Sequence, residues 1–200
     1  MNKIHYLYCV LLSFTIVLSA CHSKKAVLRR ESGESENTVL RGEPGELVKP
    51  AVSIAEKYSA MMGVDKSEIR NGRLYAFIDE WWGTPYKYGG VDKDGVDCSA
   101  LAQTLEQQVF GINIPRTTSE QVTIIKRKFE EELQEGDLVF FDYDGGKFNH
   151  VGVYLQNGYL VHASSSKGVT IVRLHDPSLY KHFSRAGSIL PDQGVDPESK

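Results

Sequence analysis

Residues 95–101 read Gly95-Val96-Asp97-Cys98-Ser99-Ala100-Leu101, and apolar residues at helical spacing continue from Cys98 to Phe110. Asp97 is a natural N-cap for this helix, because its carboxylate can accept a backbone N–H from the first turn. Cys98 then lies in that turn, where unpaired N–H groups and the positive end of the helix dipole stabilise a thiolate. We therefore expect a nucleophilic thiol with a lowered pKa. A small, buried structural cysteine is the alternative.

The N-terminal stretch up to Cys21 has the pattern of an export signal. Lys3 and His5 give it a short polar start, residues 6–18 are apolar, and Leu18-Ser19-Ala20 places small residues before Cys21. The apolar run falls short of the roughly 20 residues that span a bilayer. Leu-Ser-Ala-Cys is similar to the bacterial lipobox, in which the cysteine becomes lipidated. The similarity implies a signal peptide over residues 1–20 and a lipid anchor at Cys21, with a signal and a chance cysteine as the alternative.

Removal of the signal and lipidation of Cys21 would leave Cys98 as the single free thiol of the exported protein. Without a disulfide partner in an oxidising compartment, Cys98 is a candidate reactive thiol. Residues 21–50 are rich in Ser, Glu, Gly, Lys and Arg, and they predict a flexible tether. We assign residues 51–192 to one domain and residues 193–200 to a disordered tail.

Size and charge exclude several classes of protein. A chain of 200 residues allows one domain with a sizeable core plus extra pieces at the ends. Its 23 Lys and Arg residues against 26 Asp and Glu residues give a net charge of −3, and no basic block stands out. Nucleic acid is therefore not an expected partner. Nothing in the sequence suggests an obligate dimer, and we expect a monomer.

The domain begins with helical patterns and ends with strand patterns. Apolar residues at helical spacing predict helices over residues 51–62, 74–81, 98–110 and 119–125. Short apolar runs between Gly, Asn and Asp turns predict strands over residues 138–141, 151–155, 159–163, 169–172 and 185–190. Helices followed by an antiparallel sheet is the α+β arrangement.

The turn between the second and third of these strands decides where two histidines lie. If residues 157–158 alone formed the turn, His150 and His162 would point to opposite faces of the sheet. If residues 156–158 form a three-residue loop, the apolar residues gather on one face, and His162 lies opposite Gly152 and about 7–8 Å from His150. The apolar pattern favours this second register. A cysteine and two paired histidines then suggest a nucleophile, its base and a group that orients the base.

A metal site is the competing chemical use of cysteine and histidine. Zinc requires three or four ligands, usually with two of them at short spacing. No short Cys or His pair occurs at that spacing, and the spare histidines of the exported chain are His22, His175 and His182. We expect neither a metal nor a cofactor.

Five segments together resemble the NlpC-type, papain-like peptidases of bacterial cell walls, and most of all the short Spr-type lipoproteins. They occur in the family's order over roughly residues 74–190, as Gly83-Thr84-Pro85-Tyr86, Asp97-Cys98-Ser99, Glu135-Gly136-Asp137-Leu138, Asn149-His150-Val151-Gly152 and Val161-His162-Ala163. The resemblance implies a papain-like α+β fold with the catalytic cysteine at a helix N-terminus against an antiparallel sheet. It also implies a place in the bacterial envelope, lipid-anchored at the periplasmic face of the outer membrane.

The resemblance implies a role for each residue of the site. Cys98 would attack a peptide carbonyl, His150 would move its proton, and His162 would fix the orientation of His150. The Cys98 backbone N–H and the Tyr86 hydroxyl would stabilise the oxyanion, with packing beside Trp82 as the alternative for Tyr86. The substrate would be peptidoglycan, cut between D-Glu and diaminopimelate in a stem peptide or between D-Ala and diaminopimelate in a cross-link.

The expected substrate contacts also come from the resemblance. Asp97 and Ser99 match residues that bind the free amino end of a stem peptide in some relatives. Those relatives use an SH3-like domain to close the site, and no such domain fits before Leu74, so a helix cap is the alternative for Asp97. Arg116 and Gln121 are expected in the groove, with a solvated loop as the alternative. An amidase or acyltransferase on the same scaffold, or a non-catalytic wall-binding lipoprotein, would be the alternative functions.

Overall fold

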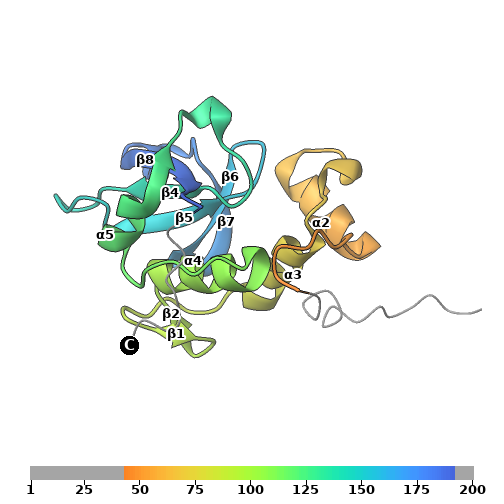
Figure 1. Cartoon of the computed structure of the whole chain (residues 1–200), viewed down its shortest axis with the longest axis horizontal. Coiled ribbons are helices and arrows are strands. Elements are labelled where there is room, and N and C mark those ends of the chain that lie inside the picture. Colours follow the sequence, from red (N-terminus) through yellow and green to blue (C-terminus); the bar gives the residue numbers. More distant parts are fainter. Residues whose placement is uncertain (1–42, 192–200) are drawn as a thin grey trace, which may run out of the picture. The chain divides into compact units, whose positions relative to one another are not determined.

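The computed structural model describes residues 43–191 (Figure 1). The predicted signal peptide, the lipidation site at Cys21 and the predicted tail lie outside the described residues. Residues 43–50, which we predicted as the end of the tether, form hydrogen bonds with the domain. Gly45 N–H donates to the Val109 carbonyl at 2.9 Å, and Gly72 N–H donates to the Val48 carbonyl at 2.7 Å. Within the described residues, the ordered unit therefore begins before Ala51.

The longer helices lie in the first half of the described chain, and the six strands of the main sheet lie in the second half. The helices are α2 (Val52–Met62), η2 (Lys66–Glu68), α3 (Gly72–Trp81), α4 (Cys98–Leu105), the π-helix η3 (Glu106–Phe110), α5 (Thr118–Gln121), η4 (Val122–Ile124), η5 (Glu130–Glu132) and α6 (Pro177–Tyr180). The strands are β1 (Val91–Asp92), β2 (Gly95–Val96), β3 (Ile125–Arg127), β4 (Leu138–Phe141), β5 (His150–Tyr154), β6 (Tyr159–Ser164), β7 (Gly168–Arg173) and β8 (Phe183–Ile189). The predicted α+β class is confirmed.

Strands β3 to β8 form a six-stranded antiparallel sheet in the order β3-β8-β4-β5-β6-β7. One predicted boundary is wrong, because Ile125 does not end the helix that starts near Ser119. The 3₁₀ turn η4 ends that helix, and the β-branched Ile125 pairs with Ile189 on β8 instead. Residues 91–96 form the small β1–β2 hairpin, with Val91 opposite Val96.

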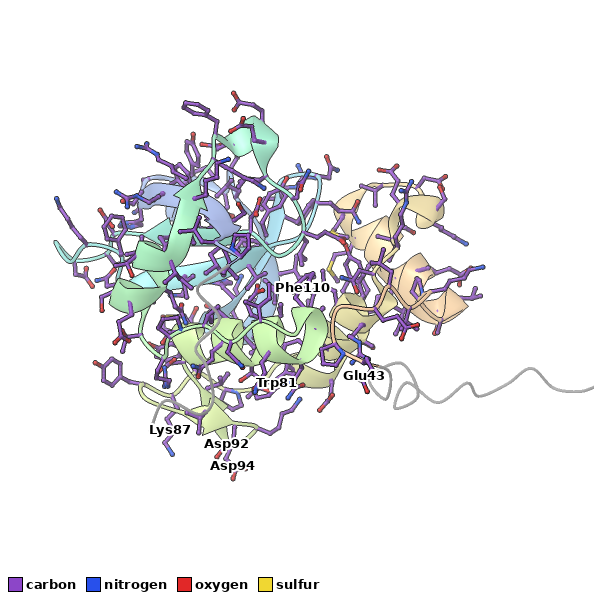
Figure 2. All side chains as sticks on the ribbon, in the orientation of Figure 1. Glu43, Trp81, Lys87, Asp92, Asp94 and Phe110 are labelled. Carbon is purple, nitrogen blue, oxygen red and sulfur yellow. The ribbon has the colours of Figure 1, made fainter. Side chains whose placement is uncertain are left out.

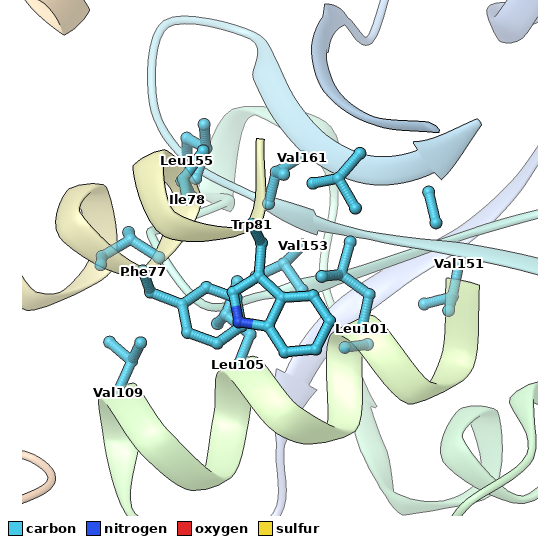
Figure 3. Close-up of a cluster of buried hydrophobic side chains, with 14 of the residues drawn as sticks. Phe77, Ile78, Trp81, Leu101, Leu105, Val109, Val151, Val153, Leu155 and Val161 are labelled. Atoms are coloured by element: carbon cyan, nitrogen blue, oxygen red, sulfur yellow. The ribbon is translucent and has the colours of Figure 1, made fainter. Parts of the chain in front are cut away.

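Helix α4 lies against β5 and β6 and shares a core with α3 (Figure 1). Figure 3 shows the Trp81 ring of α3 among side chains from α4 and the two strands. Trp81 stacks on Phe77 with ring centroids 5.6 Å apart. The core-facing residues of α4 recur at three- and four-residue intervals and are buried: Leu101, Ala102, Leu105 and, in η3, Val109. This packing fixes α4, and with it Cys98, on one face of the sheet.

The predicted three-residue loop of the β5–β6 hairpin is confirmed. Val153 faces Val161 in the ladder, and Leu155 N–H donates to the Tyr159 carbonyl at 2.8 Å. A Cβ on Gly152 would lie 2.5 Å from Leu160 Cδ1 and 3.0 Å from the Val161 carbonyl oxygen, so any larger residue here would force the neighbouring atoms of β6 to shift. The register turns the valines toward the helices and the two histidines toward the other face.

Glu106, at the junction of α4 and η3, is a buried acid far from any solvent contact, with 1% of its surface exposed. Burial and the nearby Asp137 carboxylate raise the pKa of Glu106 well above its usual range. Because the folded state favours the protonated acid, the stability that this preference contributes is fully present below the unfolded-state pKa. It is lost as the pH rises from there toward the folded-state pKa.

Glu106→Gln should therefore be more stable than the wild type at pH 8, by about 1 kcal/mol or more, since it removes a buried ionisable acid. The gain should shrink as the pH falls toward 4.5. Urea unfolding of both proteins at several pH values measures this difference. A difference that does not change with pH would contradict the buried-acid account.

Candidate active site

The first turn of α4 carries Cys98 and is capped as the sequence predicts. Asp97 is in extended conformation, and its carboxylate accepts the Ala100 N–H at 2.7 Å. Cys98 is buried, with 6% of its surface exposed. Its sulfur accepts a hydrogen bond from the backbone N–H of Val151, the residue that follows His150. The thiol is therefore held against the start of β5.

The two histidines meet on the face of the sheet selected by the hairpin register. His150 Nε2 lies 2.8 Å from His162 Nδ1, and the two rings are nearly perpendicular at 82°. This hydrogen bond occupies Nε2 of His150. Nδ1 is thus the ring nitrogen of His150 that this bond leaves available.

Both imidazoles are neutral at neutral pH. Burial lowers the pKa of His150 to about 3, and the neighbouring His162 adds to the effect. Burial also lowers the pKa of His162 to about 4, with a further contribution from the Lys167 ammonium on the β6–β7 turn. Each of the two imidazoles therefore has an unprotonated ring nitrogen at rest.

The expectation of a lowered thiol pKa is wrong for the free protein. Burial raises the pKa of the Cys98 thiol, and the negative charge of Asp97 adds to this. Hydrogen bonds from the backbone N–H groups of Val151 and Ser99 act in the opposite direction but do not outweigh burial. At rest, the Cys98 thiol and the His150 imidazole are therefore both neutral.

Tyr86 is brought to the site by a strand-like contact with the edge of β7. Gly83 N–H donates to the Val169 carbonyl and Val169 N–H donates to the Thr84 carbonyl, each at 2.9 Å. A Cβ on Gly168 would lie 2.4 Å from the Thr84 oxygen, so glycine permits this approach. Burial raises the pKa of the Tyr86 hydroxyl, as does charge on Cys98, and the hydroxyl stays a hydrogen-bond donor at neutral pH.

A cavity of about 290 Å³ opens beside the histidine pair. It is lined by residues with aromatic, imidazole, hydroxyl, amide or carboxylate side chains: Tyr86, Tyr143, Asp144, Asn149, His150, His162, Ser164 and Ser165. Tyr143 was not among the site residues that we predicted from the sequence. Its ring lies edge-on to His150 with centroids 5.6 Å apart and stacks on His182 at 4.0 Å.

The three expected substrate contacts form one network beneath the first turn of α4. The Arg116 guanidinium donates to both Asp97 carboxylate oxygens, at 3.0 and 2.7 Å, and to the Ser99 hydroxyl at 2.8 Å. The Ser99 hydroxyl donates to Asp97 at 2.9 Å, and the Gly89 N–H donates to Asp97 at 3.0 Å. Burial disfavours the charged carboxylate, but the hydrogen bonds from Arg116, Ala100 and Ser99 outweigh it and lower the pKa of Asp97.

Gln121 was expected in the groove and instead lies in the interior. It is fully buried, and its side-chain amide donates to the Ser99 carbonyl at 3.0 Å and to the Pro115 carbonyl at 2.8 Å. The amide therefore ties the first turn of α4 to the segment that carries Arg116. No pattern in the sequence distinguishes this buried position from an exposed one.

Among residues 43–191, no group of three or more His, Cys, Asp or Glu side chains converges as metal ligands would. Within the same range, no helix combines the length and apolar character needed to cross a membrane.

A thiol at the start of a helix that packs on an antiparallel sheet, with an imidazole pair on two strands of that sheet, is the arrangement of the papain-like class. Residues 83–188 match the model of the NlpC/P60 family. The chain is 36% identical to a "Probable endopeptidase NlpC homolog" of Haemophilus influenzae, over 90% of this chain and 97% of that protein. The chain belongs to the NlpC/P60 family, and the family resemblance drawn from the sequence is confirmed.

The chain is also similar to a further curated relative and to two solved structures. The chain is 39% identical to the "Murein DD-endopeptidase MepS/Murein LD-carboxypeptidase" of Escherichia coli, over 56% of this chain and 58% of that protein. Among solved structures, an NlpC/P60 family protein of Bacillus cereus superposes with a TM-score of 0.55 at 27% identity, over 74% of this chain and 43% of that one. The NlpC/p60 domain of the peptidoglycan hydrolase SagA superposes with a TM-score of 0.50 at 28% identity, over 58% of this chain and 97% of that domain.

The rate at which iodoacetamide alkylates Cys98 should rise with pH around a midpoint above the usual thiol value of about 8.5, because burial disfavours the thiolate. Residues 22–200 contain no other cysteine, so this form of the protein gives a single-site measurement by intact-mass spectrometry. A plateau already reached at pH 7 would instead indicate a resting thiolate–imidazolium pair.

Proposed function

We propose that this protein is a cysteine endopeptidase that hydrolyses peptide bonds in peptidoglycan. The observation that carries the proposal is the 2.8 Å hydrogen bond between His150 and His162, together with a buried thiol at the start of the helix that packs on the same two strands. A protein that only binds the wall gains nothing from holding a nucleophile and two neutral imidazoles together. The names of the murein endopeptidase and the peptidoglycan hydrolase among the relatives support the substrate.

In the first half of the proposed reaction, Nδ1 of His150 takes the Cys98 proton as the sulfur attacks the carbonyl carbon of the peptide bond. The tetrahedral intermediate then loses the amine, which receives the same proton from His150, and a thioester remains on Cys98. In the second half, His150 accepts a proton from water, the hydroxide attacks the thioester, and the carboxylic acid and the thiol are released.

Two further groups support these steps. The His162 hydrogen bond to Nε2 keeps Nδ1 of His150 turned toward the sulfur and stabilises the imidazolium that forms. The Cys98 backbone N–H and the Tyr86 hydroxyl are the proposed donors to the oxyanion, and loss of one such donor typically costs about 10²–10³ in rate.

In our proposal, the role of Asp97, Ser99 and Arg116 in the reaction is to position the nucleophile. The carboxylate of Asp97 already accepts hydrogen bonds from Arg116, Ser99, Ala100 and Gly89. This leaves it little capacity to bind the amino end of a substrate. Its network instead fixes the turn that presents the nucleophile.

The exported form is proposed to be a monomer anchored to the envelope membrane by lipid at Cys21. The bond cut is proposed to be either D-Glu–diaminopimelate or D-Ala–diaminopimelate. An amidase or acyltransferase would pass through the same thioester and differ only in the amine or water that resolves it.

Digestion of purified sacculi by residues 22–200 should release shortened or uncross-linked muropeptides, whereas Cys98→Ala should release none. Mass spectrometry of the products measures this directly and reports which bond is cut. If both proteins bind sacculi and neither changes them, the chain is a wall-binding protein and the peptidase proposal fails.

His162→Gln should lower kcat by about 10²-fold or more with little change in KM, because general-base catalysis by a misoriented imidazole is lost while the groove is kept. His175→Gln is the matched control, since His175 is exposed and pairs with Glu130 away from the cleft. Steady-state kinetics on soluble muropeptides compare the two. Equal kcat values for both variants would exclude an orienting role for His162.

A further inference from the structure

The cleft beside the histidine pair contains one carboxylate that the proposed reaction does not use. Asp144 lines the cavity together with the two neutral imidazoles and with tyrosine, serine and asparagine side chains. It is the one acidic residue of this lining set, and both imidazoles of the set are neutral at neutral pH. Among residues 43–191, the Asp144 carboxylate has no hydrogen-bond or ion-pair partner.

The backbone under Asp144 is held in one conformation. Asp144 and Gly145 have φ values of 51° and 77°, and the Gly146 N–H donates to the Tyr143 carbonyl at 2.9 Å. Positive φ at both central residues with this bond is the geometry of a type I′ turn. The Asn149 side chain closes the loop, since it accepts the Tyr143 N–H and donates to the Tyr143 carbonyl, each at 2.8 Å. The carboxylate is thus presented to the cleft by a preorganised turn.

Two other carboxylates near the site already have partners. Asp176, whose charge acts on Tyr143, accepts hydrogen bonds from the backbone N–H and the hydroxyl of Ser178. Asp97, next to the nucleophile, forms an ion pair with Arg116 at 2.7 Å and has four hydrogen-bond partners. A positively charged group of a substrate entering the cleft would therefore meet Asp144 as its free counter-charge. The hydroxyls of Ser164 and Ser165 line the same cavity and can accept further hydrogen bonds from an ammonium group.

We propose that Asp144 is a specificity-determining residue that binds the free ammonium group of a diamino acid close to the scissile bond. The inference rests on the proposed function and deepens it, since both candidate bonds belong to stem peptides built with diaminopimelate. An ammonium group gives a charge-assisted hydrogen bond to the carboxylate, and such bonds are stronger than neutral ones. Neutralising the amine removes this contact.

A purely structural role for Asp144 is separable from this one. Asp-Gly and Asn-Gly are both favoured in type I′ turns, and asparagine tolerates positive φ. Asp144→Asn therefore keeps the turn and the shape of the side chain while it removes the charge. Asp94→Asn is the matched control, because Asp94 lies on the β1–β2 turn (Figure 2) and does not line the cleft.

The experiment compares two soluble substrates, cross-linked muropeptides with a free diaminopimelate amine and the same muropeptides after acetylation of that amine. The wild type and Asp94→Asn should prefer the free amine by about tenfold in kcat/KM. Asp144→Asn should cleave the free-amine substrate about tenfold more slowly than the wild type. It should cleave the acetylated substrate as the wild type does, and so show no preference.

Three outcomes would overturn the inference. The first is a wild type that shows no preference between the two substrates. The second is an Asp144→Asn variant that keeps the wild-type preference. The third is an Asp144→Asn variant that also fails to cleave the acetylated substrate, which would assign the residue to folding of the turn. Failure of the proposed function is distinguishable from all three, since neither substrate would then be cleaved by any of the proteins.

Discussion

The hydrogen bond between His150 and His162 is the contact on which the site depends, and it exists because of the hairpin that joins β5 to β6. The three-residue loop places Val153 opposite Val161, and the apolar face of the same hairpin packs on α4. A slip of one residue would expose that face and move the histidines apart. The packing that buries the core therefore also assembles the proposed base, and it presses Cys98 against the start of β5.

Burial sets the charge state of this site. The thiol and both imidazoles are neutral at rest because each lies where a charge would be poorly solvated. The charge that remains near the nucleophile is on Asp97, and Arg116 pairs with it. In the proposed reaction the proton moves from sulfur to imidazole as the carbonyl is attacked, so charge separation develops only with donors for the oxyanion in place.

The fold and the meeting of the two histidines could be predicted from the sequence, because both follow from the periodicity of the apolar residues. Apolar alternation selected the hairpin register, and Asp97 identified the start of α4. The thiol pKa was predicted in the wrong direction, since it depends on burial against β5 and on charge from Asp97, neither of which a local pattern contains. Gln121 and Asp144 show the same limit, because one is buried and the other faces the cleft only through tertiary packing. The catalytic roles of Cys98, His150 and His162 stay predictions.

The central claim is that the resting site pairs a neutral Cys98 with a neutral His150 oriented by His162. Nitrogen NMR of the ¹⁵N-labelled histidines, titrated from pH 7 downward, tests it most directly. We predict that both rings stay neutral through pH 5, with Nε2 of His150 and Nδ1 of His162 sharing one proton in a hydrogen bond. A His150 ring that is an imidazolium at pH 7, and that becomes neutral in Cys98→Ala, would contradict the account by revealing a preformed ion pair.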